Sequence, residues 1–157
     1  MTRSKASATS DSRESREQWL QLDRQLCFAL YSSSLAMTRI YKPLLAPLGL
    51  TYPQYLVMLV LWEADGPSVS QLGQRLSLDS GTLTPLLKRL ETLGLIARLR
   101  AAEDERRVHI KLTAAGRRLK ARAAKVPGCV LAATGCPLPE VVRLRGKIQQ
   151  LRDRLAG

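Results

Sequence analysis

Aromatic residues are scarce in this chain of 157 residues, which has one Phe, two Trp and four Tyr. A core made from this composition must be mainly aliphatic. At this length a single domain is expected, and about 70% of the surface of the unfolded chain can be buried on folding without disulfides or metals. A two-domain enzyme with a separate cofactor domain is therefore not expected.

Long apolar runs are also missing, because the longest one is interrupted by Glu63 and Asp65 before it reaches the roughly 20 residues of a membrane-spanning helix. Residues 1–17 mix both charge signs with Ser and Thr and lack the apolar segment of a signal peptide. We expect a flexible tail over 1–17 and a soluble, cytoplasmic protein.

Cysteine and histidine are too few and too scattered for a metal site. Cys27, Cys129 and Cys136 have neither Cys-x-x-Cys spacing nor a nearby His. An odd number of cysteines does not make a secreted disulfide framework, so free thiols in a reducing compartment are expected. His109, the one histidine, has no acidic or thiol cluster beside it, and we expect it to be structural. The sequence predicts no metal and no other cofactor.

Apolar spacing predicts a largely helical chain. A long helix is expected over 19–45 and an almost wholly apolar one over 53–63. Two short amphipathic helices around 68–76 and 82–93 follow, separated by a tight turn, and this is the helix-turn-helix pattern.

Two alternating segments, 95–100 and 108–112, come directly after the helix-turn-helix and predict a β-hairpin. The fold class is therefore mainly α with a small β-hairpin wing. Thr113 is expected to start a further helix that runs to residue 125, followed by a loop rich in Pro and Gly. In the last helix, Val141, Leu144, Ile148, Leu151 and Leu155 form one apolar stripe, which suggests packing against another subunit.

Positive charge dominates, with 25 Lys and Arg against 13 Asp and Glu and a net charge of +12. Residues 95–125 alone contain ten Lys or Arg against three acids. Such a surface fits contact with DNA phosphates, although a basic run can also be a plain solvated face. The helix pair and the hairpin favour DNA.

Candidate DNA contacts follow from this arrangement. Ser80, Thr82 and Thr84 begin the second helix of the pair, where short hydroxyl side chains can reach base edges and phosphates. Lys88 and Arg89, one to two turns later, suit the DNA backbone.

The loop of the hairpin supplies further candidates. Arg106 or Arg107 can enter the minor groove, and Asp104 can orient the Arg106 guanidinium through a charge-assisted hydrogen bond.

Cys27 lies on the apolar stripe of the first helix, where a lone cysteine is most often an inert core residue. Its neighbours favour another interpretation. Tyr31 is one helical turn further on, and Tyr41 and Tyr52 flank the break between the first two helices. Phenol groups can donate hydrogen bonds to a thiolate, which is the form that attacks peroxides.

Four segments together resemble a known family: 25–31 around Cys27, 50–58 around Tyr52, 78–90 in the second helix of the pair, and the hairpin triplet 104–106. They are similar to the organic hydroperoxide resistance regulators of the MarR family, closely over about 20–125. Cys27 and the tyrosines indicate this subfamily, whereas the winged helix alone indicates only a MarR-like protein.

The resemblance implies a homodimeric repressor that binds a pseudo-palindromic double-stranded DNA operator and is not an enzyme. Cys27 would sense organic hydroperoxides, with Tyr41 and Tyr52 as its hydrogen-bond partners and Tyr31 lining the same apolar pocket. Oxidation would shift the two DNA-binding lobes so that they no longer fit successive major grooves. Residues 18–157 would form one MarR-like domain, with dimerisation helices in 18–50 and 126–157 and the winged helix-turn-helix in 53–125.

The second thiol departs from the family pattern. Relatives with a resolving cysteine carry it towards the C-terminus of the other subunit. Cys129 and Cys136 are both candidates here, with Cys129 favoured because it lies nearer the better-matched segment. A small thiol trapping Cys27 is the alternative.

Three other functions compete. An ordinary MarR-type repressor would be released by a phenolic or lipid-like ligand, with Cys27 as a packing residue. A DNA-coating protein would bind without sequence preference. A thiol peroxidase is the weakest hypothesis, because the chain has neither a thioredoxin-like βαβ pattern nor Cys-x-x-Cys.

Overall fold

The structure, a computed structural model, describes residues 18–100 and 108–157. Its contacts divide the chain into two compact units, Met1–Arg39 and Ile40–Gly157. Within the described ranges no individual helix is long and apolar enough to cross a bilayer. Only the bent pair Leu26–Leu48 and Tyr52–Glu63 meets that test, and only when its two members are taken together.

The first long helix begins later than the sequence predicts. A short 3-10 helix η1 (Leu22–Arg24) precedes α2 (Leu26–Leu45), and between them Gln25 has extended backbone angles of φ −82° and ψ 117°. The prediction of one helix from Trp19 was therefore wrong. The apolar side chains of this segment are exposed, and a short helix without a buried face gains little stability from propensity alone.

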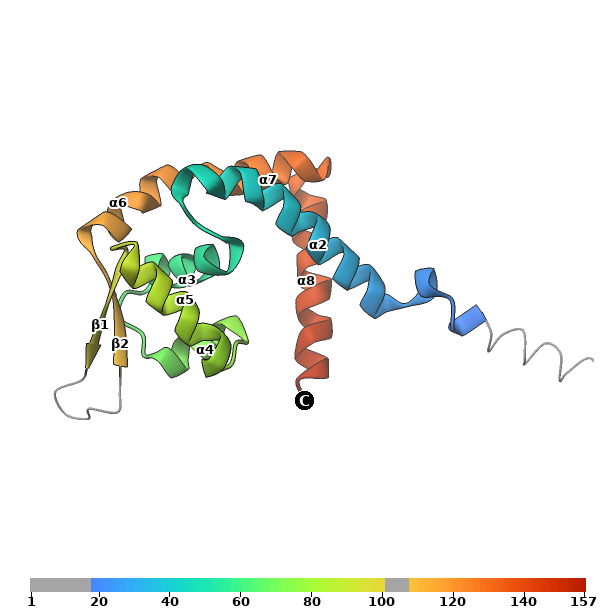
Figure 1. The fold of residues 1–157 in the computed structure, drawn as a ribbon. Coiled ribbons are helices and arrows are strands. Elements are labelled where there is room, and N and C mark those ends of the chain that lie inside the picture. The colour runs from blue at the N-terminus through green and yellow to red at the C-terminus, as the bar shows by residue number, and fades with distance from the viewer. Residues whose placement is uncertain (1–17, 101–107) are drawn as a thin grey trace, which may run out of the picture. The chain divides into compact units, whose positions relative to one another are not determined.

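The unit from Ile40 onwards contains the winged helix-turn-helix in the expected order (Figure 1). After the 3-10 helix η2 (Ala46–Leu48), its elements are α3 (Tyr52–Glu63), α4 (Val69–Leu76), α5 (Ser80–Thr92), β1 (Ile96–Arg100), β2 (Val108–Leu112) and α6 (Ala114–Ala123). The two strands pair antiparallel, with Ile96 opposite Leu112 and Arg100 opposite Val108. We call this β1–β2 hairpin the wing. A mainly helical fold with a two-stranded hairpin is confirmed.

Local signals explain where these helices begin. Thr51 and Gln54 form a capping box at the start of α3, in which Gln54 Oε1 accepts the Thr51 N–H at 2.8 Å. Ser68 and Gln71 do the same for α4. Pro85 lies inside α5, because that helix already begins at Ser80.

The core of this unit is aliphatic, as the composition requires. α3 lies at its centre and packs against α4, α5, α6 and β2. The fully buried side chains are Leu45, Val57, Met58, Leu61, Leu72, Leu83, Leu87, Leu90, Ile96, Ile110 and Val126.

The prediction of a loop after α6 is wrong over most of that segment. Residues Val126–Thr134 form a helix, α7, which ends at Gly135 in the left-handed conformation (φ 66°). Pro127 favours rather than breaks this helix, because it occupies the first turn, where its missing N–H has no partner to lose. The last helix, α8 (Leu138–Leu155), begins with Pro139 in the same place.

Exposed apolar side chains gather at the two ends of the chain. Large apolar residues are exposed between Trp19 and Leu35 and again along α8. Only Leu93 and Leu99 are exposed elsewhere among the described residues. The members of α8 are Leu138, Val142, Leu144, Ile148 and Leu155. Apolar faces of this extent are typical of surfaces that bury against a partner.

Candidate DNA interface and redox site

The N-terminus of α5 is fixed by Asp79. Its carboxylate accepts the Thr82 backbone N–H at 2.8 Å through Oδ1 and the Thr82 hydroxyl at 3.0 Å through Oδ2. The hydrogen bond from the Thr82 backbone, followed by that from its side chain, lowers the pKa of Asp79 below its ordinary value. The hydroxyl proton of Thr82 is thus already donated to Asp79. The hydroxyl oxygen of Thr82 can still accept a hydrogen bond from a ligand.

The five predicted contact residues of α5 lie on one helix and differ in exposure. Ser80, Thr82, Lys88 and Arg89 are exposed, whereas Thr84 is half-buried. The hydroxyl residues lie at the N-terminal end of α5, and the two cations lie one to two turns later. The predicted wing contacts Asp104, Arg106 and Arg107 fall outside the described residues.

The turn between α4 and α5 is tight. Ser77 adopts the left-handed conformation (φ 54°), and Leu78 donates its N–H to the Gly73 carbonyl at 2.9 Å. A Cβ on Gly73 would lie 2.8 Å from the Leu78 carbonyl oxygen. A residue without a side chain is therefore required for α4 and α5 to approach this closely.

Some of the Lys and Arg side chains counted in 95–125 bind acceptors within the chain itself. Arg117 pairs with Asp65 at 2.8 Å, Lys120 Nζ donates to the Trp62 carbonyl at 2.9 Å, and Arg122 donates to the Pro47 carbonyl at 2.6 Å. A count of charges along the sequence misses this, since it does not show which cations have acceptors in their own fold.

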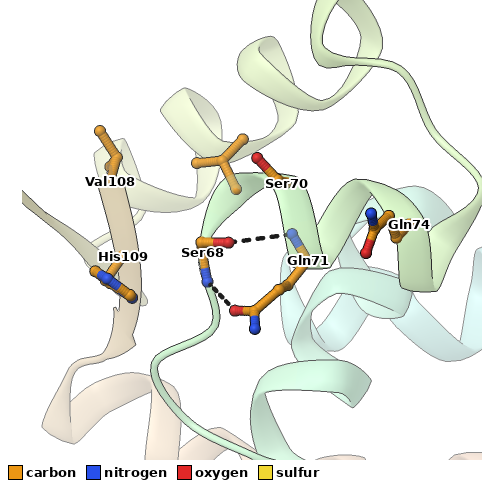
Figure 2. A pocket seen from close by; sticks show the side chains of 7 residues that line it. Ser68, Ser70, Gln71, Gln74, Val108 and His109 are labelled. Carbon is orange, nitrogen blue, oxygen red and sulfur yellow. Dashed lines mark hydrogen bonds between the residues drawn. The ribbon is translucent and has the colours of Figure 1, made fainter. Parts of the chain in front are cut away.

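A hollow of 590 Å³ lies between the start of α4 and the first residues of β2 (Figure 2). Ser68, Ser70, Gln71 and Gln74 line it from the side of α4, and Val108 and His109 line it from the side of β2. The imidazole Nδ1 of His109 is 3.0 Å from the Gly66 carbonyl oxygen. This contact ties the strand to the loop before α4, which is a structural role for His109. In the described ranges no group of three or more His, Cys, Asp or Glu is placed to hold a metal ion.

Cys27 and Tyr31 lie one turn apart on α2, within the unit Met1–Arg39, and both are exposed. Their exposure shows that neither side chain is part of the packed core of that unit. The expectation that a lone cysteine here is an inert core residue is therefore not supported by its surroundings.

Tyr41 and Tyr52, in the unit from Ile40 onwards, lie together. Their ring centroids are 4.6 Å apart, and Tyr41 is 5.8 Å from the ring of Tyr55. Burial raises the pKa of Tyr41 and of Tyr52, so both phenols remain protonated hydrogen-bond donors at neutral pH. Sequence reasoning missed Tyr55, although its spacing of three residues from Tyr52 places it on the same side of α3.

The two remaining thiols differ in accessibility. Cys129 is exposed on α7, whereas Cys136 is half-buried just after it. The Cys136 thiol lies 3.5 Å from the Thr134 carbonyl oxygen, and its backbone N–H donates to the Thr134 hydroxyl at 3.2 Å. Of the two thiols, Cys129 is therefore the more exposed.

A smaller apolar groove of 240 Å³ lies along α3, α6 and the start of α7. Tyr55, Leu59 and Trp62 line one side, and Ala123 and Pro127 line the other. The sequence patterns did not reveal this groove, because it forms between helices that are far apart in the chain.

Comparison with known proteins places this chain in a family. Residues 39–123 match the family model described as Transcriptional regulator SarA/Rot. The chain is 48% identical over 136 residues to the organic hydroperoxide resistance transcriptional regulator of Bacillus subtilis, covering 87% of this chain and 92% of the relative.

Solved structures agree. Reduced AbfR bound to DNA, a protein of Staphylococcus epidermidis, matches with a TM-score of 0.74 and 32% identity over 90% of this chain and 99% of the other. The disulfide form of AbfR matches with a TM-score of 0.60 and 34% identity, covering 92% and 96% of the two chains. The chain belongs to the organic hydroperoxide resistance regulators, within the MarR family of DNA-binding winged helix-turn-helix transcription regulators.

Proposed function

We propose that this protein is a homodimeric repressor that leaves its DNA operator when an organic hydroperoxide oxidises Cys27. The observation that carries the proposal is an exposed thiol at Cys27 in a chain 48% identical to an organic hydroperoxide resistance regulator. The related AbfR supports a redox role, since its structures include reduced, overoxidised and disulfide forms. The protein would act in the cytoplasm as a regulator and not as an enzyme.

The chemistry needs only the thiol and the peroxide. The Cys27 thiolate attacks the outer oxygen of the hydroperoxide, the O–O bond breaks, and an alcohol leaves after taking up a proton. Cys27 is oxidised to a sulfenic acid, and the peroxide is reduced by two electrons. Tyr41 and Tyr52, both protonated at neutral pH, would donate hydrogen bonds to the thiolate, and Tyr31 would line the apolar approach.

A second thiol then condenses with the sulfenic acid, forming a disulfide and releasing water. Cys129 of the other subunit is our first choice for this resolving thiol because it is the more exposed of the two candidates. Cys136 and a small cellular thiol are the alternatives. A covalent link between subunits would change the spacing of the two DNA-binding lobes.

The DNA contacts we propose combine α5 with the loop of the wing. The start of α5 would enter the major groove, later cations would bind phosphates, and an arginine of the loop would enter the minor groove. The residues are Ser80, Thr82, Thr84, Lys88, Arg89, Asp104, Arg106 and Arg107. A symmetric dimer carrying two such surfaces implies a pseudo-palindromic operator of double-stranded DNA.

Dimerisation is supported by the apolar side chains at both ends of the chain. Segments 18–50 and 126–157 contain the long helices α2 and α8, and most of the large apolar residues of α8 are exposed. A second copy of the chain would bury these faces.

The apolar groove lined by Tyr55, Leu59 and Trp62 favours one alternative, namely release by a non-covalent phenolic or lipid-like ligand. Its 240 Å³ lies below the usual range for drug-sized ligands, roughly 300–1,000 Å³, so it would hold a small ligand or part of a larger one.

The test is release of a DNA duplex selected by the unaltered protein from a random pool. One equivalent of cumene hydroperoxide should abolish binding of the unaltered protein and leave binding of Cys27→Ser intact. Release of both proteins by the peroxide would contradict sensing by Cys27. Release of both by a phenol, with no effect of the peroxide, would establish the ligand alternative. If random DNA competes for the protein as efficiently as the selected duplex does, the protein is a DNA-coating protein without sequence preference.

A further inference from the structure

We propose that Asp65 is a positioning residue for DNA binding: its carboxylate holds the base of the wing and the start of α6 against the end of α3. The protein's affinity for DNA would then depend on an acidic side chain that does not contact DNA. The inference rests on the proposed contribution of the wing to DNA binding.

Three hydrogen bonds form a closed triangle around Asp65, which lies in the turn after α3. Its Oδ1 accepts the backbone N–H of Leu112, the last residue of β2, at 2.8 Å. Its Oδ2 pairs with Arg117 Nη1 of α6 at 2.8 Å. The other guanidinium nitrogen, Nη2, donates to the Leu112 carbonyl at 3.0 Å. One carboxylate therefore connects the end of α3, the base of the wing and the first turns of α6.

The orientation of the wing depends mainly on the bond between Asp65 and the Leu112 backbone. The Arg117 side chain is 60% exposed, and an exposed ion pair contributes little by itself because water screens it. Asp65 is 25% exposed at its side chain, and Leu112 is buried. A hydrogen bond from a backbone N–H to an ionised, partly buried carboxylate is short and directional, and it is stronger than a hydrogen bond between two neutral groups.

Neighbouring contacts join the same three elements. The Ile110 N–H donates to the Pro67 carbonyl at 2.9 Å, and the Trp62 indole N–H donates to the Gly116 carbonyl at 2.9 Å. These bonds keep the wing attached when Asp65 is changed. Loss of the carboxylate should therefore alter the orientation of the wing without unfolding it.

Charge alone predicts the opposite result, which makes the inference testable. Asp65 lies beside positive charge, because it pairs with Arg117 and because Lys111 directly precedes Leu112, whose N–H it accepts. An acid in that place repels phosphate, so its neutralisation would strengthen binding if charge were its only effect. A positioning role predicts that neutralisation weakens binding.

The experiment compares Asp65→Asn with Glu63→Gln in the full chain, using a DNA duplex selected from a random pool by the unaltered protein. Glu63 is 61% exposed and pairs with Arg75 of α4, so its replacement removes the same charge two residues away without touching the wing. In Asp65→Asn a neutral amide oxygen replaces the charged acceptor of the Leu112 N–H, and the ion pair with Arg117 is lost. We expect this to weaken binding by about fivefold to tenfold, the size of a coupling between neighbouring groups. Glu63→Gln should bind unchanged or slightly tighter. Equal or tighter binding by Asp65→Asn would overturn the inference.

Two further readouts separate positioning from a general loss of structure. Unfolding lowers the active fraction, which a stoichiometric titration measures, and it leaves the dependence of affinity on salt unchanged. A displaced wing lowers the slope of log affinity against log salt concentration by about one per lost phosphate contact. An unchanged slope at full active fraction would contradict the inference.

Arg117→Gln and the double variant test whether Arg117 is instead an independent phosphate contact. If Arg117 acts through Asp65, the double variant binds no more weakly than the weaker single variant. Additive losses would overturn this part of the inference.

Should Asp65→Asn fail to fold, Asp65→Glu keeps the charge but lengthens the side chain, and we expect it to weaken binding about threefold. Unchanged affinity of Asp65→Glu would then overturn the inference, whereas absence of any specific binding by the unaltered protein would overturn the proposed function.

Discussion

The indole N–H of Trp62 donates to the carbonyl oxygen of Gly116 at 2.9 Å, which joins the last turn of α3 to the first turn of α6. The same residue, Gly116, lies against the backbone of Leu95. A Cβ there would come within 2.1 Å of the Leu95 carbonyl oxygen and 3.1 Å of Leu112 Cδ2. The wing and α6 can therefore be this close only with glycine at position 116.

Gly116→Ala should lower the free energy of unfolding by about 1–3 kcal/mol, the usual cost of inserting an extra carbon into a well-packed site. Thermal unfolding measures this. Gly128→Ala is the matched control, because Gly128 is also helical but a Cβ added to it would meet nothing within 4 Å. There Ala should stabilise by roughly 0.5–1 kcal/mol through helix propensity. Equal effects of the two substitutions would refute the close approach.

The order of elements in the winged helix-turn-helix could be predicted because each local signal agreed with the packing. Thr51, Ser68 and Thr113 have side chains suited to starting a helix, and α3, α4 and α6 begin directly after them. The two alternating segments predicted as strands, 95–100 and 108–112, agree with β1 and β2 to within one residue. Such agreement between local sequence and tertiary contacts is typical of natural folds.

Two parts could not be predicted, for different physical reasons. Pro127 and Gly128 were interpreted as a loop, although Val126 and Val130 of the same segment are buried and hold it as a helix. Tertiary burial here outweighs composition. Asp65 stood out in the sequence only as a charge that interrupts an apolar run, since its two hydrogen bonds reach residues about 50 positions further along the chain.

Cys129 and Cys136 should behave differently after oxidation. We expect a covalent dimer on non-reducing electrophoresis after one equivalent of cumene hydroperoxide, lost in Cys27→Ser and Cys129→Ser but kept in Cys136→Ser. The reason is access, since Cys129 is exposed and the Cys136 thiol lies against the Thr134 carbonyl. A dimer that persists in Cys129→Ser and disappears in Cys136→Ser would reverse the assignment, and no dimer at all would favour a small thiol.

Tyr52→Phe should slow the oxidation of Cys27 by about tenfold, because a hydrogen bond to a charged group contributes roughly 1.5–3 kcal/mol. The rate is measured by intact mass at a fixed pH with excess thiol-free peroxide. Tyr55→Phe is the control, as Tyr55 belongs to the same ring cluster but is not proposed as a partner of the thiolate. Equal rates in Tyr52→Phe and the unaltered protein would remove Tyr52 from the proposed site.

The tyrosine cluster should make the protein less stable in alkali. Burial raises the folded-state pKa of Tyr41 and Tyr52 above the ordinary value of 10.0. Between the unfolded and the folded pKa the folded state binds more protons, so stability is fully present below about pH 10 and falls as pH rises through that range. Urea unfolding between pH 8 and 11 in a variant without cysteines measures the slope. Tyr41→Phe should make it shallower, and an unchanged slope would show that Tyr41 does not carry the effect.

Lys88→Ala should weaken DNA binding because Lys88 is exposed about two and a half turns along α5 from the Asp79 cap, where the phosphate backbone would run. Loss of one phosphate contact lowers the slope of log affinity against log salt concentration by about one and weakens binding similarly for selected and random DNA. Arg154→Ala removes the same charge from the end of α8 and is the control for net charge. Thr84→Val should behave differently from Lys88→Ala, changing the preferred base sequence while leaving the salt dependence intact, because a hydroxyl that reads a base edge releases no counterion. A salt slope that falls equally in Lys88→Ala and Arg154→Ala would mean that overall charge, and not the placement of Lys88 on α5, governs the attraction to DNA.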